Sequence, residues 1–136
     1  MDMTGRALIA GEASGTTLLL RSPISFWGGV DPHTGRISDP RHPNYDDCIT
    51  DRILIIPATA GSSSSSAIML ELLRNGLAPA ALLLVRHDGI LALGVLVARE
   101  LGYGTIPVIE LSPEISGLLP DGVAARVKGT GSVEIL

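Results

Sequence analysis

The chain has 136 residues, a formal net charge of −4 and a single cysteine, Cys48. Its acidic balance and an aromatic content of 3% exclude the basic patch and stacking surface of a nucleic-acid-binding protein. One cysteine permits no internal disulfide and cannot alone hold an iron–sulfur cluster, so we expect a cytoplasmic protein with no metal site of its own. Hydrophobic residues reach 46%, which indicates either elements covered on both faces or a surface that meets a partner.

Two short apolar segments, 7–12 and 16–21, flank Ala13-Ser14-Gly15, and this pattern predicts a β-hairpin at the start of the chain. The next loop carries Phe26 and Trp27 followed by a glycine pair. We expect both aromatic side chains to anchor this loop to the core. The glycines permit positive φ or the close approach of another backbone or a ligand.

Five residues between positions 33 and 48 are of types that can bind metals, but they lack the close spacing of a metal site. They are His33, His42, Asp46, Asp47 and Cys48. We therefore interpret this polar, proline-containing stretch as a loop whose side chains face solvent.

The centre of the chain predicts a strand, a tight loop and a helix. The β-branched run 53–56 is stopped by Pro57, and five serines at 62–66 lead into a helix-forming segment, 67–74, closed by Asn75-Gly76. A serine tract is often a flexible linker, but this one joins an apolar strand directly to an apolar helix. We therefore place it inside the fold.

The serine tract can be interpreted in two ways. One serine at a helix N-terminus is commonly a cap and nothing more. Five hydroxyls beside free backbone amides and the positive end of a helix dipole suit an anionic ligand such as a carboxylate or phosphate. We call residues 61–64 the serine loop.

The second half predicts further strands at 80–85 and 106–111 and a helix at 89–101 that ends at Gly102. Pro107 favours an edge strand or the beginning of a strand. Alternating residues from 123 to 135 predict a hairpin that turns at 129–131. Together these elements predict one α/β domain over residues 1–136. It has a βαβαβ middle between two hairpins. The start lacks the basic and apolar pattern of a signal peptide, and neither 77–85 nor 90–98 is long enough to cross a membrane.

Three kinds of catalytic loop do not fit the serines. A serine hydrolase needs Gly-x-Ser-x-Gly and a base, and the run from Gly61 lacks the second glycine. His87-Asp88 could supply a base only if folding brought it close to the serines, and nothing in the sequence indicates that it does. A P-loop needs a lysine that is absent there. A phosphohistidine carrier needs a histidine within its turn.

The run Ser-Phe-Trp-Gly-Gly-Val-Asp-Pro at 25–32, Gly61 with its serines, and Ala-Pro-Ala-Ala at 78–81 together resemble the small subunit of the aconitase X family. The resemblance implies a swivelling β/β/α domain with a mixed or barrel-like β core and flanking helices. It also implies a separate large subunit that forms a heterodimer or higher complex with this chain and holds an iron or iron–sulfur centre. Members of the family are hydro-lyases that dehydrate small hydroxy acids.

By this resemblance Ser62 is the proton acceptor, and Gly61, Ser63 and Ser64 bind the substrate near its anionic group. The large subunit's metal then acts on the departing hydroxyl. The serine run favours cis-3-hydroxy-L-proline as substrate, with (R)-5-phosphomevalonate as the alternative. A non-catalytic anion-binding or regulatory module, and a scaffold domain whose serines only cap a helix, stay open.

One departure from the family pattern concerns charge. Members often carry Gly-Arg before the serines, where this chain has Thr59-Ala60. That arginine is a natural partner for a substrate carboxylate. The sequence alone does not place Arg21, Arg52 or Arg86 at the site.

Overall fold

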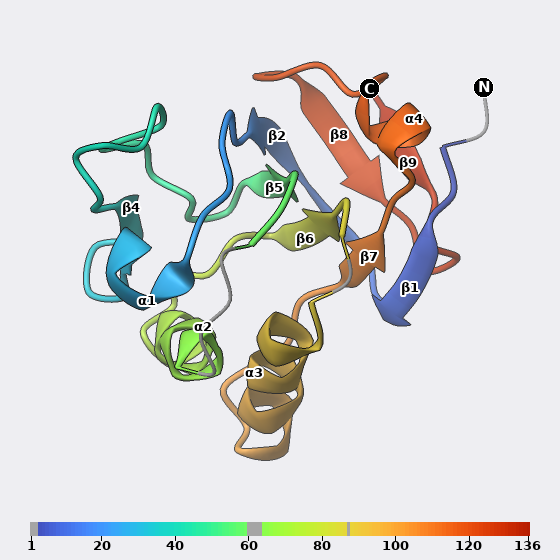
Figure 1. Cartoon of the computed structure of the whole chain (residues 1–136). Coiled ribbons are helices and arrows are strands. Elements are labelled where there is room, and N and C mark those ends of the chain that lie inside the picture. Colours follow the sequence, from blue (N-terminus) through green and yellow to red (C-terminus); the bar gives the residue numbers. More distant parts are fainter. Residues whose placement is uncertain (1–2, 60–63, 87) are drawn as a thin grey trace.

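The computed structural model describes residues 3–59, 64–86 and 88–136. Within these residues a seven-stranded mixed sheet curls in the order β1-β7-β6-β5-β2-β8-β9, and α2 and α3 cover one of its sides (Figure 1). The sheet consists of β1 (Arg6–Ile9), β2 (Ala13–Leu19), β5 (Ile53–Ile56), β6 (Ala81–Leu84), β7 (Val108–Glu110), β8 (Ala124–Val127) and β9 (Val133–Ile135). The remaining elements are α1 (Phe26–Gly29), β3 (Val30–Asp31), β4 (Arg36–Ile37), α2 (Ser65–Arg74), α3 (Gly89–Glu100) and α4 (Pro113–Ser116).

The centre of the sheet is parallel and buried on both faces. β5 pairs in parallel with β2 and β6, and β6 pairs in parallel with β7. Leu54 and Ile56 belong to the core cluster that includes the α2 and α3 side chains, whereas Ile53 and Ile55 belong to a second cluster with β8 and β9. Continuous apolar runs are typical of strands covered on two sides, which is why the sequence located β5 correctly.

The two ends of the sheet approach each other, which gives the expected barrel-like core. Thr4 forms an antiparallel bridge with Ser132, and the Gly5 amide donates to the Gly131 carbonyl at 3.0 Å. The predicted C-terminal hairpin is confirmed as β8 and β9, with Gly131 at φ +89° in the turn. The predicted mixed α/β swivel architecture is therefore confirmed.

The predicted N-terminal hairpin is wrong. β1 pairs antiparallel with β7, and β2 pairs with β5 and β8, so the two strands are not neighbours. The supposed turn at 13–15 lies within β2. A Cβ added at Gly15 would lie 2.6 Å from the Asp51 carbonyl oxygen. Glycine is required there for close backbone approach, which the sequence pattern does not distinguish from a turn.

α2 and α3 pack closely where Gly94 of α3 meets α2. A Cβ added at Gly94 would lie 2.6 Å from the Ser66 carbonyl oxygen and 3.0 Å from the Met69 Cβ. Because backbone atoms cannot move aside cheaply, this glycine sets the distance between the two helices. Both helices start at the carboxyl edge of the sheet, so their separation also fixes the spacing of the loops there.

We therefore expect Gly94→Ala to lower the free energy of unfolding by about 1 to 3 kcal/mol, as overpacking does, despite the better helix propensity of alanine. Urea denaturation of the isolated chain measures this. The matched control is Gly117→Ala, where the nearest atom lies 3.4 Å from the added Cβ, and we expect no loss of stability. Equal stability of Gly94→Ala and wild type would contradict the close approach.

Candidate functional site at the carboxyl edge of the sheet

The site is set by the pairing of β5 with β6. Their parallel register places both carboxyl ends at one edge of the sheet, where the loop before α2 and the loop before α3 begin. Open α/β sheets bind ligands at this edge because loops and helix N-termini gather there. Of the predicted site residues, Gly61, Ser62 and Ser63 lie outside the described residues, so their assigned roles stay predictions.

Ser64 directly precedes α2 and has helical backbone angles (φ −68°, ψ −14°). Its hydroxyl makes no capping hydrogen bond to the first helical amides. Ser65, the first helical residue, is buried at 4% exposure. The interpretation of the serines as simple caps therefore gains no support from Ser64, and its role in substrate binding stays a prediction.

The two loops at this edge are joined by side chains. Thr59 Oγ1 donates to Asp88 Oδ2 at 2.5 Å, and Asp88 Oδ1 accepts from the Ile90 and Leu91 amides at 2.9 and 3.3 Å. Asp88 is buried at 8% exposure and is the N-cap of α3. His87 lies outside the described residues.

The loop that contains the aromatic pair lies beside the same edge. Ile24 forms an isolated parallel β-bridge with Thr59, and the Ile24 amide donates to the Ala58 carbonyl at 3.2 Å. Phe26 is buried at 1% exposure, as expected, but Trp27 is 59% exposed, so the expectation that Trp27 packs into the core is wrong. Gly28 has φ +77°, which confirms one expected use of the glycine pair.

Trp27 also lines a groove of about 540 Å³. The opposite wall comes from the 38–42 segment, with Ser38, Pro40, Arg41 and His42. The Arg41 amide donates to Asp39 Oδ1 at 3.0 Å and holds the pKa of that carboxyl below its ordinary value. The Ser38 hydroxyl donates to the Gly28 carbonyl at 3.2 Å, which ties the two walls together.

The interpretation of the polar loop is correct for His33, Asp46 and Asp47, which are exposed, but wrong for His42. His42 is buried at 8% exposure, and its Nε2 donates to the Ser22 carbonyl at 3.1 Å while its Nδ1 accepts from the Asn44 amide at 3.0 Å. Both ring nitrogens therefore fix the loop. Within residues 3–59, 64–86 and 88–136 no group of three or more His, Cys, Asp or Glu could hold a metal ion.

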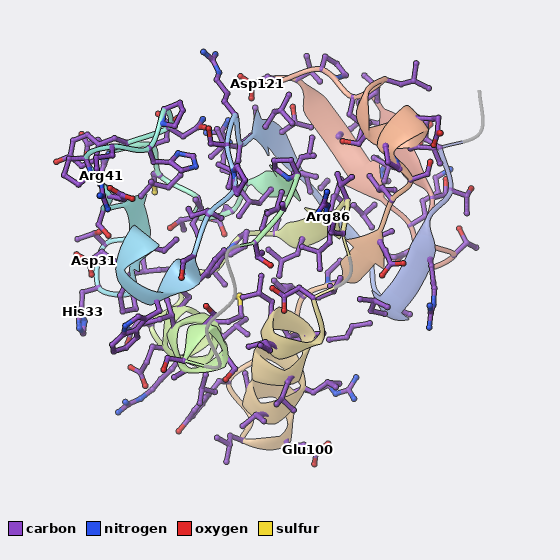
Figure 2. The ribbon with its side chains drawn as sticks, in the orientation of Figure 1. Asp31, His33, Arg41, Arg86, Glu100 and Asp121 are labelled. Atoms are coloured by element: carbon purple, nitrogen blue, oxygen red, sulfur yellow. The ribbon has the colours of Figure 1, made fainter. Side chains whose placement is uncertain are left out.

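The structure places two of the three unassigned arginines clearly. The Arg52 guanidinium donates to the Thr16 and Thr17 carbonyls at the amino end of β5, opposite the site. Arg86 follows β6 in the same loop as Asp88 and is exposed (Figure 2). Arg86 is thus a cation on the correct edge, although the sequence around the serines gave no sign of it.

A curled mixed sheet with its helix N-termini and connecting loops gathered at one edge defines the swivel class of β/β/α domain. Residues 2–135 match the family model described as the aconitase X swivel domain. The chain belongs to this family. Its computed structure is similar to the crystal structure of Thermococcus kodakaraensis aconitase X in the holo form, with a TM-score of 0.88, 31% identity and coverage of 100% of this chain and 98% of that chain.

Named relatives fall into two groups. The chain is 46% identical over 103 residues to cis-3-hydroxy-L-proline dehydratase of Pseudomonas aeruginosa and 44% identical over 108 residues to that of Hypocrea jecorina. These matches cover 76% and 79% of this chain but only 18% of each relative. It is also 35% identical over 137 residues to the phosphomevalonate dehydratase small subunit of Pyrococcus furiosus, covering 100% of this chain and 96% of that protein.

The adjacent aromatic residues give a matched test of this loop. Because Phe26 is buried and Trp27 is not, we expect Phe26→Ala to cost about 3 to 5 kcal/mol of unfolding free energy. Trp27→Ala should change it by less than about 1 kcal/mol, in the range of ordinary surface substitutions. Urea denaturation of the isolated chain measures both. Similar losses from the two variants would show that Trp27 packs as Phe26 does.

Proposed function

We propose that this chain is one swivel domain that works as the small subunit of an aconitase X-type dehydratase. With a large subunit it dehydrates a small hydroxy acid, first of all cis-3-hydroxy-L-proline. The observation that carries the proposal is the family match over residues 2–135; it is supported by the parallel β5–β6 pair, at whose carboxyl edge the loops before α2 and α3 begin. The identities of 44% and 46% favour hydroxyproline, whereas the length match favours phosphomevalonate.

The need for a partner follows from the relatives' lengths. The chain spans about a fifth of the cis-3-hydroxy-L-proline dehydratases, and it covers nearly all of a protein named as a small subunit. By the chain's resemblance to the aconitase X family, the iron or iron–sulfur centre is proposed to lie in the large subunit. What this chain contributes is substrate binding and proton transfer.

In the proposed reaction Ser62 Oγ takes a proton from the carbon next to the hydroxyl-bearing carbon of the substrate. The electron pair of that C–H bond forms the new carbon–carbon double bond as the carbon–oxygen bond breaks, and the oxygen leaves with the electron pair of that bond as hydroxide, which takes up a proton and is released as water. A serine accepts a proton only where its alkoxide is stabilised. The positive end of the α2 dipole supports such stabilisation, and Gly61, Ser63 and Ser64 are proposed to bind the anionic substrate beside it.

The site also needs a positive charge for the substrate carboxylate, because Thr59-Ala60 replaces the usual arginine. Arg86 lies on the neighbouring loop, two residues before Asp88. We assign it as the cation of this chain that meets the substrate. A bidentate guanidinium–carboxylate pair would fix the orientation of the substrate as well as its charge.

The decisive measurement of function is turnover of cis-3-hydroxy-L-proline by the chain co-purified with the large subunit from its own genome. We expect turnover by the complex and none by either subunit alone, because the proposed base and the proposed metal lie on different chains. (R)-5-phosphomevalonate is tested in parallel. Turnover of the phosphorylated compound alone would move the assignment to the alternative substrate. Activity of the isolated small subunit would contradict the subunit proposal.

Ser62→Ala tests the assigned base. Loss of a general base lowers kcat by roughly 10²- to 10⁴-fold, and we expect a loss of this size with the complex still formed. Ser112→Ala is the control, since Ser112 Oγ caps α4 by accepting from the Ile115 amide at 3.3 Å. Loss of that cap should cost about 1 kcal/mol of stability and leave kcat unchanged. If Ser62→Ala behaves like Ser112→Ala, the serine is a cap and not the base.

A further inference from the structure

The Asp88 carboxylate does two things at once. Its Oδ1 accepts from the Ile90 and Leu91 amides and so caps α3, the ordinary function of an aspartate at this position. Serine caps a helix about as well as aspartate, with a shorter and uncharged side chain. The cap therefore does not account for the second oxygen of this residue.

That second oxygen is used in a contact between loops. Asp88 Oδ2 accepts from Thr59 Oγ1 at 2.5 Å, across a sequence separation of 29 residues. The Asp88 carboxylate is buried at 8% exposure and Thr59 is half-buried, so the bond is charge-assisted and partly shielded from water. It joins the loop that follows β5 to the first turn of α3.

Thr59 is also held from its other side. The backbone of Thr59 forms a parallel β-bridge with Ile24, and the Ile24 amide donates to the Ala58 carbonyl at 3.2 Å. Thr59, two positions before the serine loop, is therefore held by a backbone contact with Ile24 and by a side-chain hydrogen bond to Asp88. Beyond that loop, the buried Ser65 begins α2.

We infer that Asp88 is a positioning residue of the active site, which acts through Thr59 to hold the point where the chain enters the serine loop. The inference rests on the function proposed above. It assigns no contact between Asp88 and substrate. A displacement of about 1 Å in a reacting group can cost about 100-fold in rate. A part-buried bond that fixes the entrance to the loop therefore bears on kcat more than on substrate affinity.

The test compares variants of the small subunit within the complex. Thr59→Val removes the donor and leaves the cap of α3 intact, while Asp88→Ser keeps a capping oxygen but is too short to reach Thr59. Thr59→Ser restores the hydroxyl. The matched control is Thr17→Val. Thr17 is a fully buried residue of β2 whose hydroxyl donates to the Pro120 carbonyl at 2.7 Å, and it lies beside Ile53 at the amino end of β5, away from the site.

We expect Thr59→Val and Asp88→Ser each to lower kcat by roughly 10- to 100-fold, with KM changed by no more than about twofold. The double variant should be no slower than the slower single one, because both remove the same bond. Thr59→Ser should retain most of the turnover, and Thr17→Val should retain all of it. Unchanged kcat in the two link variants, or an equal fall in Thr17→Val, would overturn the inference.

Hydrogen exchange of backbone amides in the isolated chain gives a second readout that needs no turnover. Thr59→Val and Asp88→Ser should speed exchange in the peptides that cover 57–64 and 85–91, whereas Thr17→Val should not. Unchanged exchange in both link variants would overturn the positioning role. If the wild-type complex dehydrates neither hydroxy acid, the proposed function fails on its own, and the exchange data still decide whether the bond holds the loop.

Discussion

The parallel pairing of β5 with β6 is the constraint on which the rest of the structure depends. Both strands are apolar on both faces, so no side chain within them can carry chemistry without losing burial. Polar groups are therefore confined to the two edges. At the amino edge the Arg52 guanidinium donates to carbonyls of β2, a structural use of charge. At the carboxyl edge two helices begin, and this is the edge where we propose that the anionic substrate binds.

Much of this framework could be predicted from the sequence. β5 and β6 are continuous apolar runs, the β8–β9 hairpin alternates apolar and polar residues, and Pro57, Gly76 and Gly102 mark clear stops after β5, α2 and α3. Pro107 correctly marked the beginning of β7, although that strand lies inside the sheet between β6 and β1. Local patterns succeed here because burial and capping act over a few residues.

The errors have a common physical origin, since each depends on a distant neighbour. Gly15 looked like a turn residue because it stands between two apolar segments. Its actual role, the close approach to Asp51, involves a residue far away in the chain and leaves no local pattern. Phe26 and Trp27 are adjacent and equally apolar in the sequence, and only the tertiary packing decides which one faces the core. The Thr59–Asp88 bond is of the same kind, because a threonine and an aspartate 29 residues apart give no local signal.

The closure of the sheet has a consequence for how this family is built. The Val133 amide donates to the Met3 carbonyl at 2.9 Å and Thr4 forms an antiparallel bridge with Ser132, so the segment just before β1 lies beside the start of β9, and the first and last described segments are close in space (Figure 1). A module whose ends meet can be joined to another polypeptide through either end, or inserted into it, without stretching its own backbone. Among the relatives, matches of 18% and 96% of the whole protein show this same module both within a long chain and as almost an entire subunit. The closeness of the two ends is compatible with both arrangements.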